Sequence, residues 1–222
     1  MATERHPYDR LKRALDIFIA SLALLVLSPV LLGVSVAVAL AMGRPVLFRQ
    51  SRPGRYGALF ELRKFRTMHP PGRGRVSDGE RLTRFGRWLR LTSLDELPTL
   101  WNVLRGDMSL VGPRPLLVQY LDRYTPKQAR RHEVRPGVTG LAQVRGRNAL
   151  SWEEKFAYDV RYVDGRCLWL DLRILLETVV KVARRDGITA DGHATAPEFL
   201  GTARSLADAS RGGTSRDASW RT

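Results

Sequence analysis

Two adjacent carboxylates, Asp95 and Glu96, are the residues of this sequence best suited to chemistry on an anionic substrate. Ser93 precedes Glu96 by three residues, which is the spacing of a capping box at the start of a helix. There the positive end of the helix dipole would keep Asp95 ionised and would also attract a phosphate. An ionised carboxylate beside a phosphate site has what a covalent phosphoryl transfer requires. The alternative is that both acids are solvated residues at an ordinary helix start.

The segment after this pair predicts an amphipathic helix followed by a stiff arm. The apolar residues that recur at helical spacing are Leu94, Leu97, Trp101 and Leu104. Gly106 is expected to end this helix, because glycine readily takes the left-handed backbone found at helix ends. Pro113 and Pro115 restrict the residues before them to extended geometry, so they hold Arg114 out from the chain. An arginine presented in this way near an acidic helix start is suited to clamp an anion.

Both motifs lie within one longer stretch, RLTRFGRWLRLTSLDELPTLWNVLRGDMSLVGPRP. This stretch resembles the core signature of the bacterial monotopic phosphoglycosyl transferases, the initiating sugar transferases that begin glycoconjugate and polysaccharide assembly. The resemblance extends from about Lys12 to about Lys181. It is to the small members of the family, which consist of the catalytic domain alone.

The resemblance implies a reaction and a cofactor. A sugar 1-phosphate would pass from a UDP-sugar to a polyprenol phosphate, expected to be undecaprenyl phosphate, with release of UMP. In the family's two-step exchange, Asp95 would attack the β-phosphorus and form a sugar-phosphoryl aspartate, which the lipid phosphate then attacks. Glu96, the second acid of the family pair, would position a metal ion or activate the acceptor. The implied metal is Mg²⁺, with Asp95 and Glu96 as its protein ligands.

Basic residues would offset the negative charge of both substrates. Arg90, Arg114 and Arg147 match family positions that bind phosphate. Lys64 of the segment KFRTM is a further cation expected to bind substrate, and its alternative is a solvated lysine at a strand end. Lys64 and Arg66 alternate with their neighbours, so both are placed to face one anion.

The composition agrees with an anionic substrate or surface. The chain has 222 residues, a formal net charge of +15 and a pI near 11. Such a charge favours phosphates, anionic membrane lipids or nucleic acid as partners. A membrane-anchored nucleic-acid-binding protein is therefore one rival, but no helix-turn-helix, zinc or RNA-recognition signature accompanies the arginines, and we expect no nucleic-acid partner. A membrane phosphohydrolase that uses the same aspartate with water is the second rival.

The segment from Ile17 to Met42 contains no charged residue and is long enough to cross a bilayer core as a straight helix. Ser28-Pro29 interrupts it near the middle, where proline removes a backbone hydrogen bond. Basic residues flank both ends to a similar extent, whereas a spanning helix usually has its excess on one side. These residues leave a spanning helix and a bent helix equally open. The family, whose members dip into one leaflet, implies a re-entrant helix hairpin.

The remaining segments predict a small catalytic domain. Its expected elements are extended segments around a turn over 46–68, an amphipathic helix over 81–91, helices over 116–124 and 126–131, a strand over 138–144, a helix capped by Ser151 and Glu154, and an apolar-faced helix over 168–185. The expected fold class is α/β and mostly helical, with a re-entrant N-terminal membrane helix hairpin, interfacial amphipathic helices and a small cytoplasmic catalytic domain.

Three regions are expected along the chain. Residues 1–45 would form a basic segment and the membrane helix, residues 46–201 the catalytic domain, and residues 202–222 a disordered tail. The resemblance implies the bacterial inner membrane as the location, with the active site on its cytoplasmic face. The sequence leaves the sugar and the oligomeric state open, a homodimer included.

Overall fold

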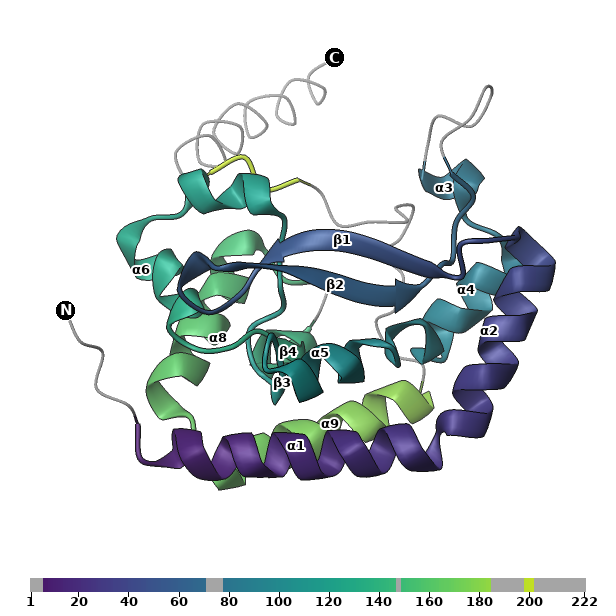
Figure 1. Ribbon diagram of the computed structural model, residues 1–222. Helices are drawn as coiled ribbons and strands as arrows, with labels where there is room; N and C mark the ends of the chain where they lie inside the picture. Colours follow the sequence, from purple (N-terminus) through teal and green to yellow (C-terminus); the bar gives the residue numbers. More distant parts are fainter. Residues whose placement is uncertain (1–5, 71–77, 147–148, 185–197, 202–222) are drawn as a thin grey trace, which may run out of the picture.

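The computed structural model describes residues 6–70, 78–146, 149–184 and 198–201 of the chain. Helices predominate in these residues, and the strands form two sheets of two strands each. Figure 1 shows the hairpin of β1 (Leu47–Pro53) and β2 (Leu59–Phe65) across one side of the molecule, with α1 (Tyr8–Val26) at the opposite side. The mostly helical α/β architecture is thus confirmed for the described residues, and the tail predicted over 202–222 lies outside them.

A sharp bend separates α1 from α2 (Ser28–Met42), and the two helix axes differ by 63°. Pro29 explains the break, because it has no N–H to donate to the carbonyl of Leu25 four residues earlier. The Ser28 hydroxyl donates to that carbonyl instead, at 2.8 Å. None of the described helices is by itself long and apolar enough to cross a membrane, although the bent pair reaches that length and composition together. The break expected at the proline is confirmed, and the membrane topology stays a prediction.

The hairpin of β1 and β2 is fixed onto the helix that follows the acidic pair. The strands lie in the region where the sequence predicts extended segments around a turn, and they run antiparallel with Phe48 opposite Lys64. Asn102 of α5 (Thr99–Arg105) is buried against β2. Its amide nitrogen donates to the carbonyl of Glu61 at 2.8 Å, and its amide oxygen accepts from the backbone N–H of Arg63 at 3.2 Å. The end of β2 that carries Lys64 is therefore held beside α5.

The acidic segment differs from the single helix predicted for it. Residues Leu94–Glu96 form a 3-10 turn, and α5 begins only at Thr99. The capping box predicted at Ser93 is wrong, because Ser93 has a left-handed backbone (φ 57°) and its hydroxyl makes no capping bond. Trp101 is 47% exposed, so the predicted apolar face is incomplete. Gly106 ends α5 in a left-handed conformation (φ 91°), as predicted.

The second half of the chain packs around a short parallel pair, β3 (Ser109–Val111) and β4 (Gly137–Thr139). The strand predicted over 138–144 is wrong beyond Thr139, because residues Leu141–Arg145 form α7. The elements between β3 and β4 are 3-10 turns at Val118–Arg123 and Arg130–Glu133 and the helix α6 (Pro126–Ala129), so the helix expected over 116–124 is a 3-10 turn. The helix α8 (Trp152–Gly165) begins with the predicted capping box of Ser151 and Glu154, and α9 (Leu168–Arg184) follows it.

Two hydrophobic cores pack α1 and α2 against the rest of the described chain. The larger core joins α1 and α5 to β3, α8 and α9. The second joins α2 to the end of β2, and Leu94, directly before Asp95, packs against it. Other large apolar side chains of α1, α2 and α9 are exposed: Ile17, Phe18, Leu22, Leu25, Leu32, Val36, Leu40, Trp169, Leu172, Leu176 and Val179. Apolar surface of this extent indicates contact with a membrane or another apolar partner.

Candidate active site

Glu96 lies at the centre of a cluster of charged side chains that come from three segments. Lys64 Nζ, at the end of β2, lies 2.5 Å from Glu96 Oε1. Arg114 Nη2, from the chain after β3, lies 2.9 Å from the same oxygen. The structure therefore brings three of the predicted site residues into direct contact, with Asp95 next to Glu96 in the 3-10 turn. The solvated alternative for Lys64 is excluded by this contact.

Asp95 is buried but unpaired. Its side chain is 8% exposed, and it makes no hydrogen bond or ion pair with any other described residue. Burial, followed by the charge of Glu96, raises the pKa of Asp95 to about 6. Three cations act in the opposite sense without reversing the shift: Lys64, Arg90 and Arg114. A carboxylate that is ionised at neutral pH and free of partners is suited to act as a nucleophile, because no bond has to break before it attacks.

Glu96 has the opposite character. Burial acts to raise the pKa of its carboxyl group, but Lys64 and Arg114 outweigh burial and hold the pKa well below its ordinary value. Burial also lowers the pKa of Lys64, and the charge of Glu96 offsets part of that effect. Neighbouring acids whose surroundings separate their pKa values in this way commonly have different roles. Here Glu96 holds Lys64 and Arg114, whereas Asp95 pairs with none of the described residues.

Arg90 approaches the same site from α4 (Arg84–Leu91). Its Nε donates to Thr67 Oγ1 at 3.1 Å, just beyond the end of β2. Gly86 permits this approach, because a Cβ at that position would lie 1.9 Å from the carbonyl oxygen of Thr67. Thr83 caps α4 by accepting from the N–H of Gly86 at 2.8 Å, so the helix predicted over 81–91 begins only at Arg84. Arg81 is the last residue of a separate short helix, α3 (Asp78–Arg81).

Arg66, a further basic residue named from the sequence, does not lie at the site. The prediction that Arg66 and Lys64 face one anion is wrong, because Arg66 donates to the carbonyls of Met42 and Gly43 at the end of α2. The chain leaves the strand after Phe65, so the alternation that would align the two side chains does not continue. Arg147 lies outside the described residues.

Comparison with known proteins agrees with this geometry. The family model described as bacterial sugar transferase matches residues 7–185. The chain belongs to the bacterial sugar transferase family. The resemblance to the initiating phosphoglycosyl transferases is therefore confirmed, and the protein is a transferase enzyme.

Several relatives carry sugar transferase names. The chain is 52% identical to an uncharacterized sugar transferase, EpsL, of Bacillus subtilis (strain 168), over 86% of this chain and 96% of that protein. It is 44% identical to a UDP-glucose:undecaprenyl-phosphate glucose-1-phosphate transferase of Caulobacter vibrioides, over 80% of this chain and 72% of that protein. It is 39% identical to an undecaprenyl-phosphate galactose phosphotransferase of Salmonella typhimurium, over 80% of this chain but 41% of that protein.

Arg131 is a further residue that supports the site of this sugar transferase. It is 3% exposed, and its Nη2 donates to the backbone carbonyl of Arg114 at 2.6 Å. The same nitrogen lies 2.8 Å from Asp159 Oδ2 on α8. Asp159 and Arg131 thus fix the backbone that presents Arg114 to Glu96. The sequence contains no local signal of this pair, because its two members are 28 residues apart.

The sugar transferase site has carboxylate oxygens that could serve as ligands on one side of a magnesium ion. Asp95 has both carboxylate oxygens unpaired among the described residues, and Glu96 Oε1 carries both cation contacts. The described part of the chain contains no group of three or more His, Cys, Asp and Glu side chains that could hold a metal ion. Mg²⁺ in phosphoryl-transfer enzymes is commonly bound by one or two carboxylates, with substrate phosphates and water as the other ligands.

Proposed function

We propose that this sugar transferase moves a sugar 1-phosphate from a UDP-sugar to undecaprenyl phosphate and releases UMP. The substrates are those in the names of the Caulobacter vibrioides and Salmonella typhimurium relatives. The observation that carries the mechanism is the buried, unpaired carboxylate of Asp95 beside Glu96, which has two cations on one oxygen. The donor sugar is left to experiment.

In the first step, a carboxylate oxygen of Asp95 attacks the β-phosphorus of the UDP-sugar. The bond between that phosphorus and the oxygen bridging to the α-phosphate breaks, and UMP leaves with the electron pair of that bond. The product is a sugar 1-phosphate joined to Asp95 as an acyl phosphate. In the second step, an oxygen of undecaprenyl phosphate attacks the same phosphorus, and the Asp95 carboxylate is released unchanged.

The cations around Asp95 lower the barrier that negative charge would otherwise impose on both steps. Lys64 and Arg114 lie on the Glu96 side of the site, and Arg90 approaches from α4. We expect Arg147 to contribute a further phosphate contact. Asp95 and Glu96 would hold Mg²⁺, which would neutralise diphosphate charge when bound.

The proposed location is the cytoplasmic face of the bacterial inner membrane, with α1 and α2 inserted as a re-entrant hairpin. Support comes from the 63° bend between them and from the apolar side chains that both helices expose. The basic amphipathic helix α4 and the apolar face of α9 would rest at the membrane surface. The net charge of +15 favours anionic lipids there.

Exchange of labelled UMP into UDP-sugar, measured without undecaprenyl phosphate, tests the mechanism. A covalent intermediate makes the first step reversible by itself, so wild type should catalyse this exchange with one or more members of a panel of UDP-sugars. Asp95→Asn should abolish it. Asp107→Asn is the matched control, because Asp107 follows α5 and its carboxylate contacts, among the described residues, Asn102 at 3.1 Å and Arg105 at 3.7 Å.

Other outcomes would favour other mechanisms. Wild type could transfer sugar phosphate to the lipid but show neither UMP exchange nor a trapped adduct. This result would indicate direct attack by the lipid phosphate, with Asp95 acting as a magnesium ligand. Release of UMP and free sugar phosphate in the absence of lipid would indicate a phosphohydrolase.

A further inference from the structure

The first turns of α1 carry polar side chains for which the proposed reaction has no use. They are Tyr8, Lys12, Arg13 and Asp16, and each bonds to a part of the catalytic domain. Asp16 is only 3% exposed, so it is not a solvated residue at a membrane surface. Burying charged groups is costly unless they are bonded, so these contacts need an explanation.

Arg13 binds the end of α5. Its Nη1 donates to the carbonyl of Val103 at 2.6 Å, and its Nη2 donates to the carbonyl of Leu104 at 2.7 Å. Carbonyls in the last turn of a helix lack the usual partner four residues later, so both can accept from the guanidinium. The Val103 carbonyl also accepts from the backbone N–H of Gly106 at 3.1 Å. Gly106 follows with its left-handed backbone, and a Cβ there would lie 3.3 Å from Arg13 Nη2. The fit between α1 and this end of α5 is therefore close.

Asp16 binds the start of β3, immediately after that turn. Its Oδ1 accepts from the hydroxyl of Ser109 at 3.1 Å and from the backbone N–H of Leu110 at 3.0 Å. Arg13 and Asp16 lie about one turn apart on α1. Together they hold the two sides of the connection between α5 and β3.

The opposite ends of α5 and β3 carry the catalytic groups. Going backward from Thr99, the first residue of α5, the chain reaches Glu96 and Asp95 within four residues. Going forward from Val111, the last residue of β3, it reaches Arg114 in three. The bond of 2.9 Å between Arg114 and Glu96 joins these two ends. The helix and the strand thus form one closed unit, held by α1 at one end and containing the active site at the other.

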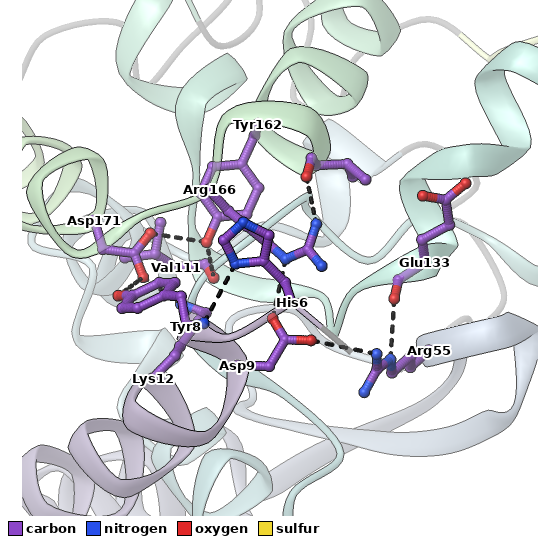
Figure 2. Close-up of polar contacts among 11 residues, drawn as sticks. His6, Tyr8, Asp9, Lys12, Arg55, Val111, Glu133, Tyr162, Arg166 and Asp171 are labelled. Atoms are coloured by element: carbon purple, nitrogen blue, oxygen red, sulfur yellow. Dashed lines mark hydrogen bonds and ion pairs between the residues drawn. The ribbon is translucent and has the colours of Figure 1, made fainter. Parts of the chain in front are cut away.

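A second set of contacts fixes β3 at its catalytic end (Figure 2). Asp171 of α9 accepts from Tyr8 at 2.7 Å and from Lys12 at 2.5 Å, both through Oδ2. Its Oδ1 lies 2.8 Å from the hydroxyl of Tyr162, which also lies 3.1 Å from the carbonyl of Val111. The start of α1 therefore reaches the last residue of β3 through α9 and α8.

From these contacts we infer that Arg13 and Asp16 are positioning residues for the transfer reaction, an inference that rests on the proposed function. By fixing the α5–β3 connection on the membrane helix, they set how Asp95 and Glu96 lie relative to Arg114. Docking of α1 then orders the active site as well as anchoring the protein. A displacement of about 1 Å in such groups can cost about 100-fold in rate.

The experiment compares full-length wild type with Arg13→Ala, Asp16→Ala and Asp16→Asn in lipid nanodiscs. Arg10→Ala is the matched control, because Arg10 lies on the same helix, is exposed, and bonds no other described residue. The measurements are kcat and KM for UMP exchange, made well below the thermal midpoint of each variant. Arg13→Lys, which keeps one donor, replaces Arg13→Ala if the latter does not fold.

Both alanine variants should lose about tenfold or more in kcat, with KM for UDP-sugar changed less than about threefold. Asp16→Asn keeps an oxygen acceptor for the Leu110 N–H, so it should recover most of kcat even if its thermal midpoint falls. Arg10→Ala should match wild type. If folded Arg13→Ala and Asp16→Ala exchange UMP at the wild-type rate, both residues only stabilise the fold and the inference is wrong. If wild type itself does not exchange UMP, the covalent mechanism of the proposed function is wrong. The same variants are then compared by their rates of sugar-phosphate transfer to undecaprenyl phosphate.

Discussion

Arg114 and Glu96, 18 residues apart in the chain, meet through Nη2 and Oε1 at 2.9 Å. Lys64 contacts the same oxygen at 2.5 Å, so Glu96 is paired with two cations while the adjacent Asp95 has none in contact among the described residues. Two neighbouring acids of similar intrinsic pKa are thereby given different ionisation behaviour. The charges of Lys64 and Arg114 still act on Asp95, where they lower its pKa against the larger effect of burial.

Arg114→Lys should lower the rate of transfer at least tenfold with little change in thermal stability. Lysine keeps the charge but loses the planar fork that can bond Glu96 and a phosphate together. Arg114 is 46% exposed, and ion pairs at that level of exposure contribute about 0 to 1 kcal/mol to folding. The measurement is kcat/KM for UMP exchange beside a thermal melt. Arg49→Lys is the control, because Arg49 pairs with Glu61 at 3.5 Å on the exposed face of the hairpin. A variant that melts early in proportion to its lost activity would make Arg114 a structural residue.

Asp95→Asn should stabilise the protein relative to wild type at pH 8, and the gain should shrink as the pH falls. Folding raises the pKa of Asp95 from 3.8 to about 6, so ionised Asp95 opposes folding. At about 1.4 kcal/mol per pKa unit, this opposition is on the order of 3 kcal/mol above pH 6, and it disappears below about pH 4, where both states are protonated. The measurement is the difference in thermal midpoint across this range.

Glu96→Gln is the control of opposite sign for that experiment. Folding lowers the pKa of Glu96, so its charge stabilises the protein above its ordinary pKa and the contribution is lost as the pH falls. Glu96→Gln should therefore reduce the thermal midpoint at pH 8. A constant difference between Asp95→Asn and wild type at every pH would show that Asp95 is not strained in the folded state.

Helix breaks and ends that depend on a single residue were predictable from the sequence. Pro29 breaks the apolar helix because proline has no backbone N–H to donate. Gly106 ends α5 because glycine readily takes the left-handed backbone found there. The family motifs led us to expect Glu96 and Arg114 at one site, whereas the segment KFRTM left Lys64 either at that site or in solvent. The contact between Lys64 and Glu96 decides for the site. The prediction at Ser93 failed because spacing cannot reveal that the backbone there is left-handed.

Contacts between distant segments were not predictable in the same way. Residues 138–144 were expected to form one strand because most of them are apolar or β-branched. In the structure Gly140 packs closely against the backbone, and a Cβ there would lie 2.1 Å from the carbonyl oxygen of Gly112. Gly140 is the residue between β4 and α7, and the segment that approaches it lies far away in the chain. The support of Arg114 by Arg131, and of α5 by Arg13, has the same origin. No periodic pattern identifies which of the many arginines meets which carbonyl.

The rate of UMP exchange should fall as the medium is acidified, with a midpoint at or below about pH 6. Attack requires the ionised carboxylate of Asp95, whose folded pKa is about 6 in the absence of metal. Bound Mg²⁺ favours the ionised form, so it should move the midpoint to lower pH. The measurement is kcat/KM for exchange between about pH 4.5 and 8 at two magnesium concentrations. A rate that rises on acidification would contradict a nucleophilic carboxylate.

The bent pair α1 and α2 should enter and leave the membrane on the same face. The single native cysteine, Cys167, is exposed and would react with labels, so it is first replaced by serine. Arg10→Cys precedes the apolar segment, and Leu59→Cys follows it at a position that is 58% exposed. Both should be labelled by a membrane-impermeant maleimide from the cytoplasmic side only. Leu25→Cys, 73% exposed near the bend, should resist the reagent because lipid would cover it.

Pro29→Ala should shift part of the population toward a spanning orientation. Restoring the N–H at position 29 allows the bond to the Leu25 carbonyl that Ser28 now satisfies, and removes the ring that clashes with the preceding turn. A straighter helix of this length reaches across the bilayer core, so Arg10→Cys and Leu59→Cys should then label from opposite sides in some molecules. Leu40→Ala is the control, since Leu40 is exposed on α2 away from the bend. Opposite-side labelling in the protein that keeps Pro29 would show that the pair spans the membrane, and the re-entrant arrangement would be wrong.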